Sequence, residues 1–173
     1  MLFRSFDNFY FLKKRRIVIN NYPIVSELIC SSKTYKNFGV TYLGGLSKIR
    51  GAFEMIKAMN LVQSNVLLTI AGDFYPHKLL DDLSQLPGWS KVISLGFIDR
   101  SSVRNLLSNS DVGLVLYHSL PNHVESQPTK FFEYMCAGVP VVASDFPLWR
   151  EIIKKHNCGL VVDPSNITDI AIF

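Results

Sequence analysis

From Phe38 onward, short apolar runs alternate with segments in which apolar residues recur every three or four positions. The short runs are typical of buried strands, and the recurring positions are typical of helices with one buried side. Strands are predicted at 38–43, 66–71, 91–95, 111–116, 140–143 and 158–162. Helices are predicted at 50–62, 77–86, 101–109, 128–137 and 146–155, with a last one starting near 166. This alternation predicts an α/β fold, a doubly wound parallel sheet with helices on both faces.

Residues 1–37 do not follow this alternation. Residues 2–16 mix apolar side chains with a basic run, in a pattern that fits a helix with one apolar side. Such a helix could lie on an anionic membrane surface, or it could pack against another domain. The second interpretation is favoured because residues 17–23 follow directly and are typical of a short strand that ends in a turn. The pattern of residues 24–37 predicts neither a helix nor a strand.

The length of 173 residues indicates one domain, and 48% hydrophobic with 18% charged residues is typical of a globular chain. The formal net charge of +4 is unevenly placed. Residues 1–20 hold five basic side chains and one acidic one, whereas the remaining residues hold 13 of each. Because the basic character belongs to one end, we expect no nucleic-acid partner.

Cysteines and histidines indicate no metal site, because Cys30, Cys136 and Cys158 lack the spacing of metal ligands and the four histidines are scattered. The cysteines are interpreted as buried thiols in a reducing compartment. No apolar run is long enough to span a bilayer, and the N-terminus lacks the pattern of a signal peptide. The expected location is cytoplasmic, and contact of the basic N-terminus with the inner face of the membrane is left open.

Candidate chemistry concentrates in residues 125–145, ESQPTKFFEYMCAGVPVVASD. A polar loop leads into a helix whose first turn holds Pro128, and Gly138 ends that helix. The N-terminus of a helix offers free amide groups and a partial positive charge, to which Lys130 adds a full charge. Glu133 lies one turn further and could accept hydrogen bonds from two hydroxyls, such as those of a ribose. Glu125 precedes Glu133 by eight residues.

This arrangement suits a ligand with phosphate in its middle and hydroxyls at both ends, as in a nucleotide sugar. The alternative is a surface helix whose apolar side holds Phe131, Phe132, Met135 and Cys136. Lys130 and Glu133 would then form one surface pair worth a few tenths of a kcal/mol.

Most of the predicted strands end in glycine or in a polar turn. These turns are Gly44-Gly45, Gly72-Asp73, Gly96, Tyr117-His118 and Ser144-Asp145. Ligands bind beyond the carboxyl ends of parallel strands, and glycine lets backbone approach a ligand closely. Each turn alone could be an ordinary connection, but the Glu125–Glu133 stretch falls on the same edge and favours ligand binding.

Glu125 and Glu133 are separated by seven residues, and residues 133–145 follow with a small-residue turn and a buried strand. This stretch resembles the signature of the retaining glycosyltransferases of family 4, which have the GT-B fold. The resemblance covers residues 16–173 and implies the Rossmann-like, C-terminal half of that fold, which binds the nucleotide-sugar donor. Residues 1–22 would then be a remnant helix and interdomain linker, and 23–173 a donor-binding domain that ends inside its last helix.

The resemblance implies a role for each candidate residue. Glu125 would be catalytic, contacting the transferred sugar, and Glu133 would hold the ribose. Arg50 and Lys130 would bind the diphosphate. The other implied donor-binding residues are Gly44, Gly45, Lys48, Gly96, Phe97, Ile98, Ser126, Gln127 and Thr129. No metal and no cofactor are implied, and the donor would be a UDP- or GDP-sugar.

The chain departs from the family pattern in the first glycine turn. Gly45 stands where the family has an arginine, and Arg50 stands where it has a lysine. Lys48 is a candidate replacement for the missing cation. Leu95 to Ile98 resemble the stretch whose backbone meets the nucleobase, and Phe97 would lie either there or in the core. His118 and His123 are interpreted as loop residues, with a general base as the alternative.

We therefore expect a donor-binding domain that transfers sugar to a glycan or lipid-linked acceptor in polysaccharide synthesis. Because the resemblance covers one of two domains, an incomplete enzyme is expected, which a separate acceptor-domain chain could complete. The alternatives are a non-catalytic nucleotide-binding fragment and a GT-B nucleotide-sugar epimerase.

Overall fold

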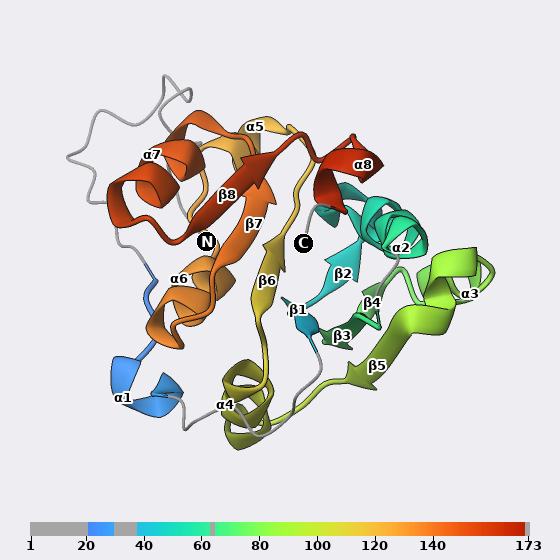
Figure 1. Cartoon of the computed structure of the whole chain (residues 1–173), viewed down its shortest axis with the longest axis horizontal. Helices are drawn as coiled ribbons and strands as arrows, with labels where there is room; N and C mark the ends of the chain where they lie inside the picture. Colours follow the sequence, from blue (N-terminus) through green and yellow to red (C-terminus); the bar gives the residue numbers. More distant parts are fainter. Residues whose placement is uncertain (1–20, 30–37, 63–64, 172–173) are drawn as a thin grey trace, which may run out of the picture.

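The computed structural model describes residues 21–29, 38–62 and 65–171. Six parallel strands form the central sheet: β1 (Gly39–Leu43), β3 (Leu67–Ala71), β5 (Val92–Gly96), β6 (Val112–Val115), β7 (Val141–Ser144) and β8 (Gly159–Val162). Their order is β5-β3-β1-β6-β7-β8 (Figure 1). This order confirms the predicted doubly wound sheet, and it reverses between β1 and β6. The crevice beyond the carboxyl ends of these two strands is the expected place for a ligand.

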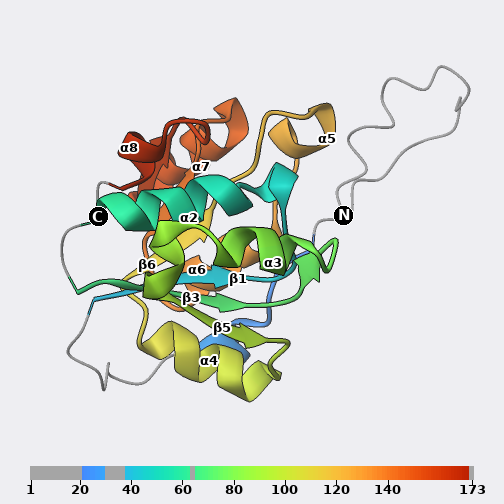
Figure 2. The ribbon, with the colours of Figure 1, turned by 90° about the vertical axis from the view of Figure 1, so that its right-hand side faces the viewer.

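Helices cover both faces of the sheet, as Figures 1 and 2 show. One face carries α2 (Ala52–Leu61), α3 (Leu79–Ser84) and α8 (Ile167–Ile170). The other carries α1 (Val25–Leu28), α4 (Arg100–Ser108), α6 (Thr129–Cys136) and α7 (Pro147–His156). The short α5 (Pro121–Val124) lies in the connection between β6 and α6. Two 3-10 helices, η2 (Lys48–Arg50) and η3 (Pro87–Lys91), complete the connections.

Side chains of the inner strands alternate between two apolar cores. Tyr42 and Leu114 face the core under α2, whereas Leu43 and Val115 face the core under α6 and α7. Trp149, on α7, is fully buried in the second core. Because both faces are covered, these strands read in the sequence as continuous apolar runs.

A second, two-stranded sheet was not predicted. It pairs β2 (Leu46–Ser47) with β4 (Phe74–Tyr75), directly after the turns that end β1 and β3. A Cβ atom on Gly72, whose φ is +149°, would lie 2.3 Å from the carbonyl oxygen of Gly44. The two turns therefore run side by side because glycine leaves room for backbone contact. Strands of two residues are too short to give a periodic pattern.

The buried side of α6 is not the side that the sequence predicted. Its buried residues are Lys130, Phe131 and Tyr134, so Lys130 does not lie on the polar surface of the helix. The assignment of Lys130 to that surface was wrong, because this lysine points toward the sheet with its neighbour Phe131. Pro128 is the N-cap residue rather than part of the first turn, and Gly138 (φ +72°) ends the helix as predicted.

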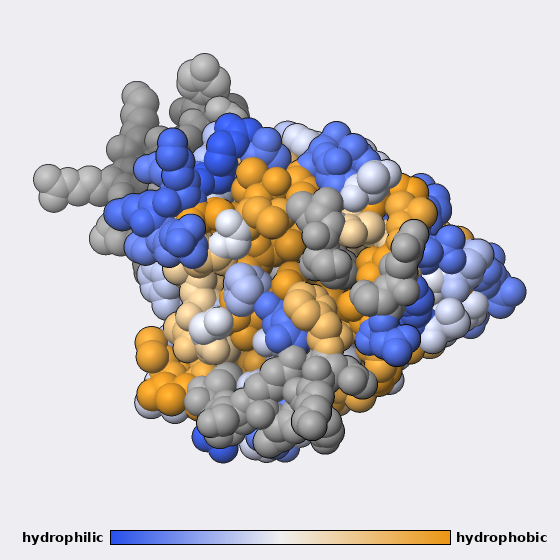
Figure 3. Space-filling model, viewed as in Figure 1, coloured by the Kyte–Doolittle hydropathy of each residue, from blue (hydrophilic) through white to orange (hydrophobic). Residues whose placement is uncertain are grey.

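The predictions for residues 2–16 and 17–20, and for Cys30, lie outside the described residues. Residues 21–29 include one helical turn, α1, in a stretch where no element was predicted. Figure 3 shows a hydrophobic patch over α1, and Ile24, Val25 and Ile29 there are each more than half exposed. No helix in the described ranges has the length and apolar character needed to cross a membrane.

Candidate functional site

A cavity of ≈ 590 Å³ opens beyond the carboxyl ends of β1, β3 and β5. Five residues predicted to bind the donor line it: Gly44, Gly45, Phe97, Ile98 and Glu133. Tyr75, Asp99 and Arg100 also line it, and the sequence did not single them out as site residues. Residues far apart in the chain thus meet at one edge of the sheet, where the turns after β1 and β3 were expected to meet a ligand. The turns Tyr117-His118 and Ser144-Asp145 do not line this cavity.

A buried ammonium group lies beside this cavity. Lys130 is only 8% exposed, and its Nζ lies 3.7 Å from the ring centroid of Tyr42 and 5.6 Å from that of Tyr117. A Cβ atom on Gly44 would lie 3.7 Å from Nζ, so the ammonium reaches the first glycine turn. No hydrogen-bond partner of Nζ is found within the described part of the chain. Burial lowers the pKa of Lys130 well below its usual range, and the nearby charge of Arg50 lowers it further.

Arg50 brings a second cation to the same place. Its Nη1 donates a hydrogen bond of 2.7 Å to the carbonyl oxygen of Gly45, and its guanidinium lies 5.6 Å from the ring centroid of Tyr117. The rings of Tyr42 and Tyr117 therefore hold two cations at the point where the strand order reverses. A buried cation without a partner costs free energy, which an anion beside Gly44 would offset. Lys48, the other cation of this turn, is exposed.

Glu133 is engaged by an arginine rather than by Lys130. Its Oε1 accepts a hydrogen bond of 2.5 Å from Nη1 of Arg100, and Nε of Arg100 lies 3.2 Å from Oε2 of Glu27. The hydrogen bond to Glu133 is the main cause that raises the pKa of Arg100. The side chain of Glu133 is 14% exposed. The alternative prediction of a surface Lys130–Glu133 pair is therefore wrong.

The end of β5 presents an aromatic side chain to solvent. Phe97 is 84% exposed at the cavity, so the alternative that placed it in the core is wrong. Gly96 supplies the left-handed backbone (φ +63°) that turns the chain there, and Ile98 packs against the core under α4 and α6. Asp99 caps α4 by accepting a hydrogen bond of 2.8 Å from the amide of Ser102, and this bond lowers the pKa of Asp99.

The loop before α6 is fixed by hydrogen bonds outside the cavity. The hydroxyl of Ser126 donates to the carbonyl of His123 at 2.8 Å, and the indole of Trp149 donates to the carbonyl of Ser126 at 2.7 Å. Oε1 of Gln127 is buried, with no partner in the described ranges. Glu125 is exposed and ends α5, and Thr129 begins α6; neither lies among the residues that line the cavity.

The two loop histidines have structural contacts of their own. Nδ1 of His123 lies 3.0 Å from the carbonyl oxygen of His118, and the ring of His123 lies 4.8 Å from that of Tyr117. Burial lowers the pKa of His123. Nε2 of His118 lies 3.3 Å from Oε1 of Glu54, on α2. These contacts support their interpretation as loop residues.

A family model described as "Glycosyl transferases group 1" matches residues 17–172. No curated protein matches the chain in sequence. Solved structures share its fold. The C-terminal domain of LpcC, a glycosyl transferase group 1 family protein from Francisella tularensis, is 19% identical, with a TM-score of 0.68 over 85% of this chain and 83% of that one.

Two further structures are of longer proteins. HepE from Anabaena, solved with UDP and glucose, is 20% identical with a TM-score of 0.69 over 88% of this chain and 44% of that one. Sucrose-phosphate synthase from Thermosynechococcus elongatus is 22% identical with a TM-score of 0.66 over 79% of this chain and 35% of that one. The chain thus spans less than half the length of these two proteins. The likeness confirms the Rossmann-like fold of a GT-B C-terminal domain.

Proposed function

The chain belongs to the family of glycosyl transferases group 1, and from this premise we propose that it binds the nucleotide-sugar donor of a retaining, family 4 glycosyltransferase. The observation that carries the proposal is the buried ammonium of Lys130, which lies beside the Gly44 turn that follows β1, next to the point where the strand order reverses. A phosphate is the natural partner for such a cation at this position of a doubly wound sheet. HepE has also been solved with UDP-glucose, which supports a UDP-sugar as the donor class.

The cavity offers a place for each part of the donor. Lys130 and Arg50 would bind the diphosphate, and the carboxylate of Glu133 would accept hydrogen bonds from the ribose hydroxyls. The backbone at Gly96–Ile98 would meet the nucleobase, and exposed Phe97 offers a ring for the base to stack on. Glu125, on the exposed loop before α6, would contact the transferred sugar from the other side of the diphosphate.

The chemistry assigned to these residues is stabilisation of the leaving group. Negative charge develops on the diphosphate as the bond to the sugar breaks, and Lys130, Arg50 and the N-terminus of α6 would offset it. The hydrogen bond from Arg50 to Gly45 ties the guanidinium to the turn, so that this cation is in place before the donor arrives. An acceptor hydroxyl, from a glycan or a lipid-linked sugar, would attack from the face that the diphosphate leaves and retain the configuration.

A thermal-shift experiment with two variants tests the proposal. UDP or GDP should raise the melting temperature of the wild-type chain, because a ligand that binds only the folded state stabilises it. Glu133→Gln should weaken binding of nucleoside and nucleotide alike by about tenfold, since hydrogen bonds to a charged group contribute about 1.5–3 kcal/mol. Lys130→Met, which keeps the buried aliphatic stem, should weaken only the ligands that carry phosphate.

Two results would contradict the proposal. One is the absence of any shift with either nucleotide at millimolar concentration. The other is an equal loss of nucleoside and nucleotide binding in both variants, because Glu133 and Lys130 would then not have the separate roles of binding ribose and phosphate. Lys57→Met, on the exposed surface of α2, is the matched control and should bind all ligands as the wild type does.

A further inference from the structure

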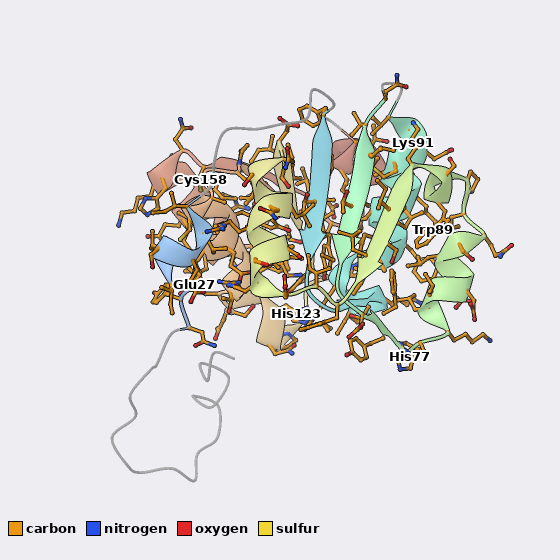
Figure 4. The ribbon with its side chains drawn as sticks, turned by 90° about the horizontal axis from the view of Figure 1, so that it is seen from below. Glu27, His77, Trp89, Lys91, His123 and Cys158 are labelled. Atoms are coloured by element: carbon orange, nitrogen blue, oxygen red, sulfur yellow. The ribbon has the colours of Figure 1, made fainter. Side chains whose placement is uncertain are left out.

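Three charged side chains from three elements are linked by two ion pairs at the edge of the cavity. Arg100 is the first residue of α4, and it bridges Glu133 on α6 at 2.5 Å and Glu27 on α1 at 3.2 Å. Figure 4 shows Glu27 on α1, beside α4 and α6. Of the three residues, Arg100 and Glu133 line the cavity. Glu27 thus reaches the candidate ribose site only through Arg100.

The segment that carries Glu27 also has apolar contacts with the core and with α6, made by residues before and after Glu27. The ring of Tyr22 meets that of Phe132 edge to face, with centroids 4.9 Å apart, and Phe132 directly precedes Glu133. Leu28 is fully buried in the core that also holds Phe131. These contacts pack the segment of α1 against α6, which places Glu27 within reach of Arg100.

The ion pair between Arg100 and Glu27 contributes little to the stability of the fold. The side chains of Arg100 and Glu27 are 41% and 44% exposed, and ion pairs between such groups add little to the free energy of unfolding. The bond between Arg100 and Glu133 instead orients a carboxylate that faces a ligand cavity. It engages Oε1, which leaves Oε2 for a ligand hydroxyl.

We propose that Arg100, itself oriented by Glu27, is a positioning residue that holds the Glu133 carboxylate for ribose and thereby makes the site select ribonucleotides over 2′-deoxyribonucleotides. This rests on the proposed ribose role of Glu133. Two physical effects support it. A carboxylate held in one orientation loses less conformational freedom when hydroxyls bind. The arginine also balances the negative charge of Glu133, which would otherwise repel the diphosphate of the same ligand.

The test compares affinities for ribo- and deoxyribonucleotides by calorimetry, with UDP and GDP and the 2′-deoxy form of each. The wild-type chain should prefer the ribose form by about tenfold, the value of one hydrogen bond to a charged group. In Arg100→Met the ribose form should bind roughly fivefold more weakly, and the preference should fall to about twofold, because the carboxylate must be ordered on binding. Glu27→Gln should change the preference in the same direction by a smaller factor.

Arg104→Met removes the same charge one turn further along α4, outside the cavity lining, and should leave the preference unchanged. Melting temperatures of all variants should lie close to that of the wild type, which separates positioning from folding. The inference is overturned if Arg100→Met keeps the wild-type preference, whether its affinities are unchanged or fall equally for both sugars. If the wild-type chain binds neither UDP nor GDP, the proposed function itself fails, and the inference fails with it.

Discussion

At the scale of single residues, the charge state of Lys130 is the feature that a ligand would change most. The groups that face its ammonium are the rings of Tyr42 and Tyr117 and the charges of Arg50 and Glu133. The ring faces and Glu133 favour the charged form, whereas Arg50 opposes it. Burial lowers the pKa of Lys130 well below its usual range. A diphosphate beside Gly44 would bring negative charge to the same point and raise this pKa again.

We therefore predict that nucleotide binding takes up a proton. Above the lowered pKa of the free protein, Lys130 is neutral, and the bound diphosphate recharges it. Affinity for UDP should consequently fall as the pH rises above the lowered pKa of Lys130 in the free protein, at pH values where the terminal phosphate of UDP, with a second pKa of about 6, is already ionised. Calorimetry in buffers of different ionisation enthalpy measures the protons taken up.

The control for this prediction is Lys130→Met, which should bind UDP weakly and with no net proton uptake in the same pH range. An equal uptake in this variant would place the proton on another group. Folding stability depends on pH with the opposite sign to UDP affinity. Between the lowered pKa of Lys130 in the folded protein and its pKa of about 10.4 in the unfolded chain, only the unfolded chain holds this proton. The contribution of Lys130 to the free energy of unfolding therefore rises with pH over this range.

At the scale of elements, α6 is tied to the sheet by one tyrosine. The hydroxyl of Tyr134 accepts a hydrogen bond from the amide of Leu43 and donates one to the carbonyl of Thr41, each at 3.0 Å, and the side chain is fully buried. Burial raises the pKa of this phenol well above its usual range. The ring also fills the space above Gly113 on β6, where a Cβ atom would lie 2.5 Å from it. Tyr134 thus fixes the helix that carries Lys130 and Glu133 relative to β1.

Tyr134→Phe should lower the free energy of unfolding by about 1–3 kcal/mol, because it leaves two buried backbone groups of β1 without their partner. Chemical denaturation measures the change. Tyr75→Phe, at an exposed tyrosine on β4, is the matched control and should change stability by less than about 0.5 kcal/mol. Equal stability of both variants would show that the two hydrogen bonds do not hold α6 on the sheet.

The elements were predictable from the sequence where a local pattern defines them, and the site only in part. The six strands and the main helices were found because both faces of the sheet are covered and each helix has one apolar side. The glutamate and lysine of α6 were singled out in the sequence because helix chemistry and the family resemblance agree there. The bond from Arg100 to Glu133 could not be found, because the two residues are 33 positions apart on different elements. The burial of Lys130 was missed because a periodic pattern counts every lysine as polar.

At the scale of the whole molecule, the proposed function makes the described residues one wall of a ligand site. The chain spans 44% of HepE and 83% of the LpcC C-terminal domain, so its fold corresponds to one domain of a GT-B protein. Glycosyl transfer requires donor and acceptor to be held together. Fixing two reactants in place can supply roughly 7–11 kcal/mol of the reduction in barrier in the best cases.

We predict that a protein made of residues 1–173 alone binds the donor but transfers no sugar to an acceptor. Without a second wall, the donor stays in contact with water, and slow hydrolysis is the most that is expected. Turnover of labelled UDP- and GDP-sugars, with membrane extract as the acceptor, measures this. Robust transfer that disappears in Glu125→Ala would contradict the prediction, and it would show that two copies, or a recruited partner, rebuild the cleft.

The most direct measurement of the central claim is hydrogen–deuterium exchange of the chain with and without saturating UDP, or GDP where that binds more tightly. The claim is that one site, at the carboxyl ends of β1 and β5 and the start of α6, binds the nucleotide. We predict slower exchange in three segments, residues 44–51, 96–100 and 129–133, with the rest of the chain nearly unchanged. Protection confined to other segments, or no protection under conditions where calorimetry detects binding, would contradict the account.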